Sequence, residues 1–299
     1  MADSLLMVLM ALFWAGAFVV GKLSISSVPP EIVAFLRFLI AGLVLLGLLA
    51  VRERQSLRLA KKDWLLVAGL GVSGIAAYNL LFFWGLRYGQ ASDGAMIIPT
   101  LNPLLTLFAA PLVLGEKLTS RKLLGAAISL CGQTLIFWGL LSTALQDPDR
   151  LRGDLFFVAS AVMWSTYTIL GRIAARRFTP LASTTWGSVS GMIMLLPFAL
   201  WTVRGSSGYT PFFWVNALYL GLGATVAGFL LWSRGIHRLG ASRAAVFINL
   251  VPVFTVALAA LFLGERPGWV QTLGMVIVMA GVYVVSTTPA PAKTESCTP

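Results

Sequence analysis

The stretch LVLGEKLTSRKLLG at residues 112–125 has a counterpart, LFLGERPGWVQTLG, at residues 261–274. The two stretches share Leu-Gly-Glu, and both end in Leu-Gly. Each stretch joins two apolar runs, so the shared letters mark the same kind of corner in two distant parts of the chain. A corner that occurs twice predicts that a larger unit has been duplicated.

The composition is that of a membrane protein. Of the 299 residues, 58% are hydrophobic and 11% are charged, whereas a soluble domain carries about 25% charged residues. Many apolar runs reach about 20 residues, the length at which an α-helix crosses a bilayer. A β-barrel would instead show short segments of alternating polarity. The sequence therefore predicts an all-α, polytopic membrane protein.

Charged residues, prolines and glycines divide the apolar sequence into ten predicted membrane-spanning helices. The connections between these helices are too short to form a soluble domain, and the polar, proline-rich tail at 289–299 is predicted to be disordered. The ten spans cover approximately residues 4–21, 32–51, 64–86, 94–114, 123–141, 155–171, 181–203, 212–233, 244–263 and 268–286.

The basic residues are distributed unevenly between the two sides of the membrane. Fifteen of the 22 Lys and Arg residues fall on the side that holds both termini, six fall on the opposite side, and Arg37 lies inside a span. Short loops rich in Lys and Arg stay in the cytoplasm, so both termini are predicted to be cytoplasmic. This distribution explains the net charge of +11 without a nucleic-acid partner.

A shift of 150 residues places the first half of the chain on the second half. We therefore predict two repeats of five helices, at residues 1–145 and 146–288, followed by the tail. Because five is an odd number, the second repeat enters the membrane from the opposite side. The matched pairs include Trp14 with Trp164, Gly85 with Gly235 and, after a one-residue gap changes the shift to 149, Pro103 with Pro252.

The charges in the connections support this inversion. The connection between the second and third spans carries five Lys or Arg residues, whereas its counterpart between the seventh and eighth spans carries one. Inverted repeats can exchange conformations, so that a central site opens to one side of the membrane and then to the other. The repeat therefore predicts a secondary transporter. A duplication that only builds a stable helix bundle is the alternative.

Three segments resemble the EamA domain: ALFWAGAFVVGKL at 11–23, PEIVAFLRFLIAG at 30–42, and INLVPVFTVALAALFLGERPGWVQTLGMVIVMAGVY at 248–283. The resemblance covers nearly the whole chain, twice. It implies the drug/metabolite transporter superfamily, with ten helices around a central cavity. Within that superfamily the chain is similar to the bacterial YddG-type exporters of aromatic and other neutral amino acids. The resemblance thus implies amino-acid export across a bacterial inner membrane.

Aromatic residues form the first group of candidate substrate-binding residues. Trp14 and Trp164 lie about ten residues into their spans, which at about 1.5 Å per residue is near the bilayer midplane. We predict that they face one cavity and offer their ring faces to an ammonium group; helix packing is the alternative. Tyr78 and Phe82 share one helix face, and Tyr167 follows Trp164 by three residues, so all three extend the same predicted wall.

Polar residues inside the spans form the second group. A buried Asn needs a hydrogen-bond partner, so Asn79 either bonds between helices or faces the cavity. Thr100, Asn102 and Asn249 lie near prolines, whose rings break the helical hydrogen-bond pattern. Hydrogen-bonding groups at such kinks are predicted to bind the carboxylate and ammonium of an amino acid. A purely structural kink is the alternative.

Arg37 is a third kind of candidate because it is a charge within a span. Charged residues inside a membrane usually serve function, so we predict that Arg37 binds a substrate carboxylate. Arg37 also lies five residues from the outer end of its span. It would therefore be able to reach the interface or to pair with Glu31.

Two motifs are predicted to be structural. Glu116 and Glu265 each follow a glycine at a helix end, where glycine supplies the C-terminal turn, and they are predicted to form corners. The stretch GLGVSG at 69–74 matches a dinucleotide-binding pattern, but it lies within a span and lacks the strand that the pattern requires. Its glycines are instead predicted to allow close helix packing.

Several functions are disfavoured by what the spans lack. They carry no Asp or Glu near their centres, and the single histidine, His237, lies in a connection. No proton carrier is therefore evident, and facilitated diffusion and proton coupling both stay open. Paired His, Cys or Asp groups of an intramembrane enzyme are missing, so we predict no enzyme activity, no cofactor and no metal.

The predicted partner is a small molecule, carried by a monomer surrounded by lipid. A phosphate-bearing substrate such as a nucleotide sugar would need several central Lys or Arg residues, and the spans supply only Arg37. A drug or another metabolite stays an alternative within the same class. Lipid scrambling is the alternative from a different class.

Overall fold

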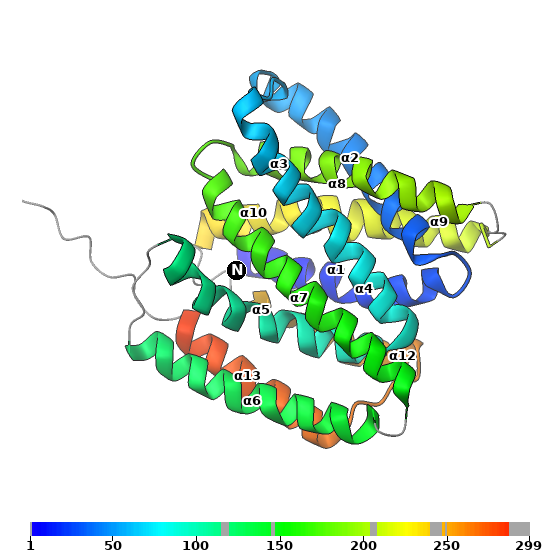
Figure 1. Cartoon of the computed structure of the whole chain (residues 1–299), viewed down its shortest axis with the longest axis vertical. Helices are drawn as coiled ribbons and strands as arrows, with labels where there is room; N and C mark the ends of the chain where they lie inside the picture. The colour runs from blue at the N-terminus through cyan, green and yellow to red at the C-terminus, as the bar shows by residue number, and fades with distance from the viewer. Residues whose placement is uncertain are drawn as a thin grey trace, which may run out of the picture.

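The computed structural model describes residues 2–114, 120–144, 147–203, 208–239, 247–248 and 250–286, and all regular structure in these ranges is helical. Ten helical segments follow one another along the described chain (Figure 1), which confirms the all-α prediction. Eight are single helices: α1 (Ala2–Ile25), α2 (Pro30–Arg52), α5 (Ala91–Leu114), α6 (Ser120–Ala144), α7 (Pro148–Ala174), α8 (Pro180–Thr202), α12 (Leu250–Phe262) and α13 (Trp269–Ser286).

The other two segments are composite. Helix α3 (Trp64–Leu70) continues through the π-helical segment η3 (Gly71–Ala76) into α4 (Ala77–Tyr88). Helix α9 (Pro211–Leu218) continues through a second π-helical segment, η5 (Tyr219–Ala227), into α10 (Gly228–Leu239). Two short 3₁₀ turns, η1 (Arg54–Leu57) and η2 (Lys61–Asp63), connect α2 to α3.

Some helices begin earlier than their apolar windows indicate. Helix α7 begins at Pro148, although the predicted span is 155–171. The carboxylate of Asp147 caps its first turn by accepting hydrogen bonds from the backbone N–H groups of Asp149 (3.1 Å) and Arg150 (3.3 Å). A hydropathy window misses this polar turn. The start of the predicted span 244–263, the corner residue Glu116 and the tail at 289–299 lie outside the described residues.

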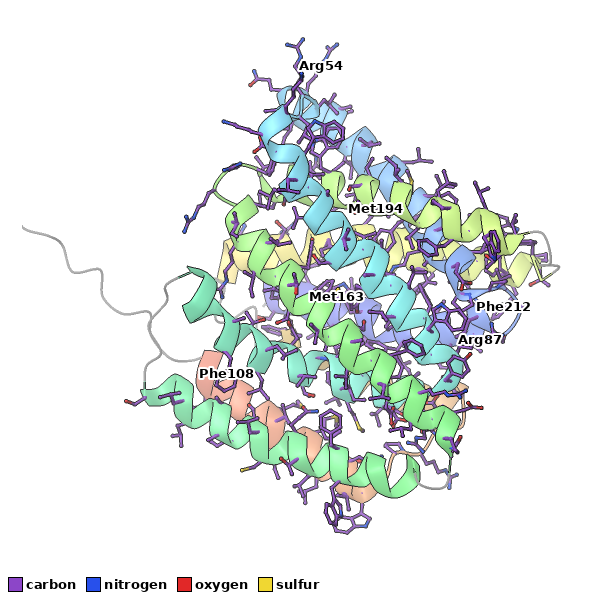
Figure 2. The ribbon with its side chains drawn as sticks, in the orientation of Figure 1. Arg54, Arg87, Phe108, Met163, Met194 and Phe212 are labelled. Carbon is purple, nitrogen blue, oxygen red and sulfur yellow. The ribbon has the colours of Figure 1, made fainter. Side chains whose placement is uncertain are left out.

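The surface is that of a chain that crosses a membrane several times. Large apolar side chains cover it, including Trp201 at 87% exposed and Trp269 at 77%; Figure 2 shows Phe212 on the same outer surface. Only contact with lipid makes so much exposed apolar surface favourable. Among the described residues, five segments are long and apolar enough to cross a bilayer: Asp3–Ile25, Pro30–Arg52, Lys61–Tyr88, Pro148–Ala174 and Pro211–Gly235.

The packing between helices repeats in the two halves. Helix α4 packs on α7 as α10 packs on α1, and α5 packs on α7 as α12 packs on α1. Gly85 has no room for a side chain, because the ring of Phe157 lies 2.6 Å from where a Cβ would be. Its repeat mate Gly235 is closed off by Met7. Phe157 and Met7 are themselves 150 residues apart, so the two contacts exchange under the repeat shift.

Equivalent helices run in opposite directions where they meet. Helices α6 and α13 lie side by side (Figure 1) and are the fifth helices of the two predicted repeats. Gly132 lies against Gly274, whereas Gly125, further back on α6, lies against Gly281, further forward on α13. The two helices are therefore antiparallel.

The two π-helical segments occupy matching positions of the repeats. Gly71, at the start of η3, has no space for a side chain because the backbone N of Gly191 lies 2.7 Å from where a Cβ would be. Gly74 is covered by the ring of Tyr167. The glycines of the 69–74 stretch thus allow close packing, as predicted. Single π-helical turns are frequent at functional sites.

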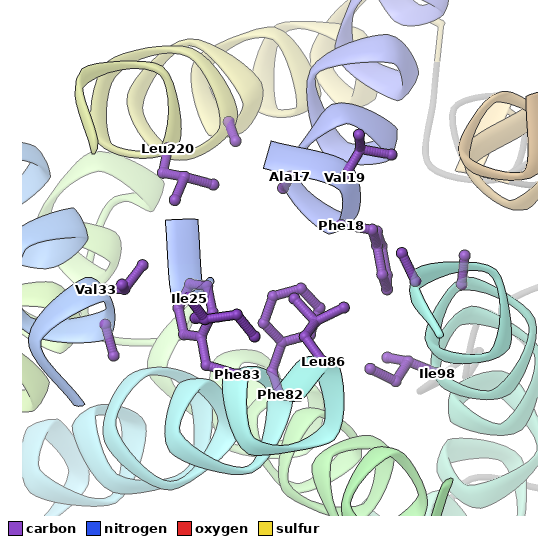
Figure 3. Packing of buried hydrophobic residues seen from close by; sticks show 14 of the residues in the cluster. Ala17, Phe18, Val19, Ile25, Val33, Phe82, Phe83, Leu86, Ile98 and Leu220 are labelled. Atoms are coloured by element: carbon purple, nitrogen blue, oxygen red, sulfur yellow. The ribbon is translucent and has the colours of Figure 1, made fainter. Parts of the chain in front are cut away.

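Helix α1 lies in the middle of the bundle and contacts helices of both halves. Its Phe18 meets Phe82 of α4 edge-on, with ring centroids 5.1 Å apart. Figure 3 shows these rings in the main hydrophobic core together with Leu86, which is also on α4, and with Ile98 of α5 and Leu220 of η5. Trp14 lies one helical turn before Phe18, so this core fixes its position.

Candidate functional site

The two tryptophans that the repeat relates come together on either side of one ring. The centroid of Phe229 lies 5.9 Å from that of Trp14 and 6.4 Å from that of Trp164. Trp14 is also held by a hydrogen bond, because its Nε1 donates to the carbonyl of Ala224 at 3.1 Å. Both tryptophans are partly exposed rather than buried.

Two tyrosines extend this group next to Trp164. The ring centroid of Tyr78 lies 4.8 Å from that of Trp164, and that of Tyr167 lies 5.2 Å from it. We call Trp14, Tyr78, Trp164, Tyr167 and Phe229 the aromatic cluster. It combines residues of α1, α4, α7 and α10, which belong to both halves.

Phe82 differs from the other aromatic candidates. It stacks on Tyr78 with centroids 5.9 Å apart, but it is only 2% exposed. Its other ring neighbours, Phe18 and Phe83, belong to the hydrophobic core. Phe82 therefore supports the ring of Tyr78 from behind.

Arg37 is buried beside polar groups of both halves, at 8% exposed. Its Nε donates to Oγ1 of Thr225 at 2.9 Å, and its Nη1 donates to Oδ1 of Asn79 at 3.2 Å. The hydroxyl of Thr225 donates to the carbonyl of Leu220 across η5, and the amide of Asn79 donates to the carbonyl of Ile75. Both oxygens are thus oriented to accept from the guanidinium.

Neither sequence-based alternative for Arg37 describes its environment. At 8% exposed the side chain does not reach the interface. Among the described residues, no ion pair joins Arg37 to Glu31 or to any other carboxylate. Three of its five N–H groups have no hydrogen-bond partner there. Within the described part of the chain, Arg37 is therefore a buried cation without a counter-charge.

The aromatic cluster and the Arg37 network are joined through neighbouring residues. Asn79 directly follows Tyr78, and Thr225 directly follows Ala224, which holds the indole of Trp14. Tyr78 of the cluster and Tyr219 lie near the guanidinium. A cation therefore lies next to aromatic rings in the interior.

Thr100 and Asn102 lie on α5, and they have different partners. The hydroxyl of Thr100 is 2.8 Å from Oε1 of Gln133 on α6, so it ties two helices together away from the aromatic cluster. Oδ1 of Asn102 accepts a hydrogen bond from Thr106, whose Oγ1 is 2.9 Å from Oγ of Ser165. Ser165 is next to Trp164, so Asn102 borders the cluster. Asn249 lies outside the described residues.

Two contributors were not predicted from the sequence. Phe229 occupies the position that matches Asn79 after the shift of 150, so the repeat itself offers a signal for it. Thr225 is a single hydroxyl in the apolar stretch GATVAG. Its role depends on the π-helical turn, which cannot be predicted from the sequence.

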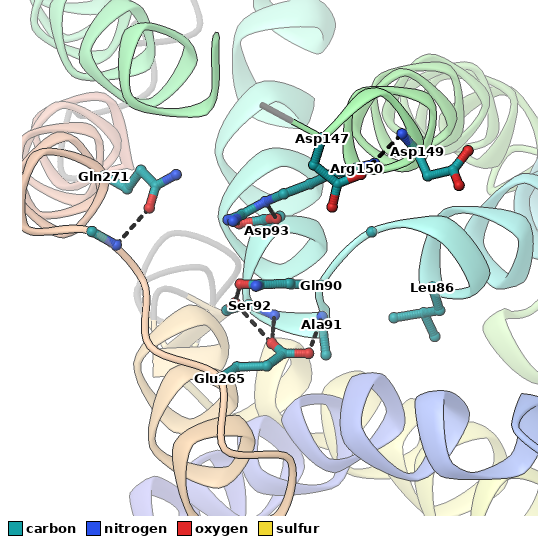
Figure 4. A network of polar contacts seen from close by, with 12 residues as sticks. Leu86, Gln90, Ala91, Ser92, Asp93, Asp147, Asp149, Arg150, Glu265 and Gln271 are labelled. Carbon is teal, nitrogen blue, oxygen red and sulfur yellow. Dashed lines mark hydrogen bonds and ion pairs between the residues drawn. The ribbon is translucent and has the colours of Figure 1, made fainter. Parts of the chain in front are cut away.

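A second polar group lies at the predicted outer end of the molecule. We call Lys22, Asp93, Arg150, Asp154 and Glu265 the charged cluster; Figure 4 shows Asp93, Arg150 and Glu265. Glu265 accepts hydrogen bonds from the backbone N–H groups of Ala91 (2.9 Å) and Ser92 (2.8 Å) at the start of α5, and from the Ser92 hydroxyl. Arg150 forms a two-pronged pair with Asp93, at 2.8 and 2.9 Å. Glu265 thus has a structural role, as predicted, but it caps the start of α5 rather than only forming its own corner.

The comparisons with known proteins decide the family. A family model described as the EamA-like transporter family matches residues 2–138 and again residues 151–287. The chain belongs to this family. It is therefore a multi-pass membrane transporter and not an enzyme, and its two matches correspond to duplicated halves.

Relatives of this transporter cover nearly its whole length. Uncharacterized transporter YyaM of Bacillus subtilis (strain 168) is 31% identical over 278 residues, which is 92% of this chain and 90% of that protein. A protein of Escherichia coli (strain K12) named Probable amino-acid metabolite efflux pump is 26% identical, with 94% of both chains covered. One solved crystal structure has a TM-score of 0.64 at 22% identity, covering 95% of this chain and 96% of that chain, which supports the fold alone.

Proposed function

We propose that this transporter exports small amphipathic metabolites, best represented by neutral and aromatic amino acids, through alternating access of a central cavity. The observation that carries the proposal is Arg37, a buried cation next to the aromatic cluster, for which the described residues supply no counter-charge and no partner for three N–H groups. The substrate carboxylate binds Arg37, and the apolar side chain packs against Trp14, Phe229 and Trp164.

Electrostatics favours a carboxylate as the group that Arg37 binds. An ionised group without a partner is costly in a low-dielectric interior. A carboxylate that forms two parallel hydrogen bonds with a guanidinium compensates that cost. Such an anion would use the N–H groups that Thr225 and Asn79 leave free. The ammonium of the same substrate is accommodated over an indole face.

The alternating-access part of the proposal is supported by the relation between the halves. Helices α6 and α13 are antiparallel, as an inverted repeat requires. Ion pairs join residues that the charge distribution predicts on one side of the membrane. They pair Asp63 with Arg177 and Asp3 with Arg234 on the predicted cytoplasmic side. We therefore propose an inner-membrane protein with cytoplasmic termini whose single chain holds the complete site.

Relatives supply independent support for the substrate class. The Escherichia coli relative is named as an amino-acid metabolite efflux pump, and a Streptantibioticus cattleyicolor relative, 24% identical over 296 residues, is named Probable terminal-alkyne amino-acid exporter. Both names specify amino acids and outward transport. Drugs and nucleotide sugars stay the alternatives, and the latter fit less well beside a single central arginine.

Counterflow into proteoliposomes tests the proposal. Vesicles with the purified protein, preloaded with unlabelled substrate, should accumulate labelled Phe and Met faster than labelled Glu, whose second carboxylate lacks a partner. Arg37→Gln should remove the uptake, and the exposed Arg87→Gln should retain it. Uptake no faster than in protein-free vesicles for all three amino acids would refute the amino-acid assignment.

A further inference from the structure

The charged cluster contains one group without a partner. Lys22 donates to the carbonyls of Leu86 and Gly89, and the other paired members are Arg150 with Asp93 and Glu265 with the start of α5. Asp154, one turn after Arg150 on α7, is 4% exposed, yet neither carboxylate oxygen has a hydrogen-bond partner among the described residues. It interacts electrostatically with Asp93 and Arg150.

The charges of this cluster do not balance. Asp93, Asp154 and Glu265 would contribute three negative charges, whereas Lys22 and Arg150 contribute two positive ones. A buried net charge is unfavourable, and a carboxyl group in such a place binds a proton instead. One proton makes the cluster neutral. Asp154 is the member that takes it, because the other two carboxylates already accept hydrogen bonds.

Other charged groups near this end do not reach Asp154. On α4, the guanidinium of Arg87 lies over the ring of Trp84, and Tyr88 stacks on Phe156. Asp149 and Arg152 pair with each other at the surface of α7. The described parts of α3, η3 and α6 that pack on α7 carry no charged side chain at this end.

The unbalanced group binds a proton rather than a metal ion. Within the described part of the chain, no three side chains of His, Cys, Asp or Glu converge closely enough to hold a metal. The cluster also joins α1, α5, α7 and the segment before α13. Opening of the predicted outer end must therefore separate these groups and admit water.

We propose that Asp154 is a proton-binding site, which holds a proton while the outer end is closed and releases it to external water when that end opens. The closed form binds the proton and the open form does not. High external pH therefore favours opening, and low external pH favours closure. A one-proton site changes the open-to-closed ratio by at most about tenfold per pH unit. This inference rests on the proposed function only in one respect: alternating access gives the reason why the outer end opens.

Thiol labelling tests this site without any substrate. Ala95, fully buried on α5, is replaced by Cys in a background with Cys131→Ala and Cys297→Ala. Intact cells are treated from outside with a membrane-impermeant maleimide at pH 6 and pH 8. With Asp154 present, the labelling rate should rise more steeply with pH than thiol ionisation alone explains. In Asp154→Asn, whose side chain stays neutral, the labelling rate should rise with pH only as much as thiol ionisation explains.

A matched control and a second variant make the outcome decisive. Asp149→Asn removes an exposed carboxylate of the same helix and should retain the full pH dependence. Asp93→Asn also makes the cluster neutral without a proton, because the ionised Asp154 is then free to pair with Arg150. This variant should therefore also remove the pH dependence of labelling that thiol ionisation does not explain. It replaces Asp154→Asn if that variant fails to reach the membrane. If the variant that is examined keeps this pH dependence unchanged, the proposal is overturned, whether or not amino acids are transported.

Discussion

The two halves of the molecule agree where helices pack and differ where the substrate is proposed to bind. The contact of Gly85 with Phe157 has its mate in that of Gly235 with Met7. In contrast, Arg37 matches Gly187, and Asn79 matches Phe229. The frame has retained its symmetry, as a mechanism that exchanges two conformations requires. The proposed site is not symmetric, as binding of an amino acid with one polar end and one apolar end would require.

The largest expected effect comes from Arg37, which has no equivalent in the second half. Arg37→Gln should reduce Phe counterflow about 100-fold, because a hydrogen bond to a charged group contributes up to about 3 kcal/mol. Gln retains donors for Asn79 and Thr225, so the fold should persist. Asn79→Asp should also block uptake, since its carboxylate would occupy the guanidinium. Normal transport in both variants would contradict the asymmetric site.

A second test addresses the symmetric frame. Gly85→Leu and Gly235→Leu should each lower stability by about 1–3 kcal/mol, the first more strongly because the ring of Phe157 yields less than the flexible Met7. Thermal unfolding in detergent measures both. Gly171→Ala is the control: that glycine has open space around it and should gain about 0.5–1 kcal/mol. If only one of the two leucine variants is destabilised, the frame is less symmetric than described.

Phe229, which takes the place of Asn79 in the second half, allows a test of the apolar end of the proposed site. Phe229→Ala should weaken Phe binding about tenfold, since an aromatic pair contributes about 0.5–1.5 kcal/mol beyond its buried area. Phe229→Leu should keep Met as a substrate. Phe212→Ala, at an exposed position of the same composite helix, is the control. Equal affinity for Phe in the parent and in Phe229→Ala would exclude this ring from the site.

The smallest effect distinguishes the two related tryptophans. Trp14 donates a hydrogen bond to Ala224, whereas the described residues offer Nε1 of Trp164 no such acceptor. Trp14→Phe should therefore cost about 1 kcal/mol of stability, and Trp164→Phe should cost less. Denaturation of the two variants followed by circular dichroism compares them. A larger loss for Trp164→Phe would reverse the assignment.

Much of the architecture could be predicted because the repeat and hydropathy are properties of the chain itself. The ten helices, the matched glycines and a structural rather than catalytic role for Glu265 follow from spacing and composition. Helix starts were less predictable, since a capped polar turn such as that of Asp147 lies outside an apolar window.

The site was predicted only in part, because it depends on how helices cross. Trp14, Trp164 and Tyr78 were chosen for their depth and helix face: Tyr78 contacts Trp164 directly, whereas Trp14 is linked to Trp164 only through Phe229. Phe229 contacts both tryptophans because α10 packs on α1 and its first turn also reaches Trp164 of α7. Thr225 reaches Arg37 through a π-helical turn, and Thr100 turns to Gln133 instead of the cluster. These contacts depend on the tertiary arrangement of the helices, which no local sequence pattern predicts.

The central claim is that Arg37 binds the carboxylate of an amino acid whose side chain lies against the aromatic cluster. Competition against labelled Phe, bound to the purified protein, measures this most directly. Phenylpropionate retains the carboxylate and phenethylamine lacks it. We predict that phenylpropionate competes and that phenethylamine does not, and that Arg37→Gln weakens the binding of Phe about 100-fold. Equal competition by both compounds, or undiminished binding by Arg37→Gln, would contradict the claim.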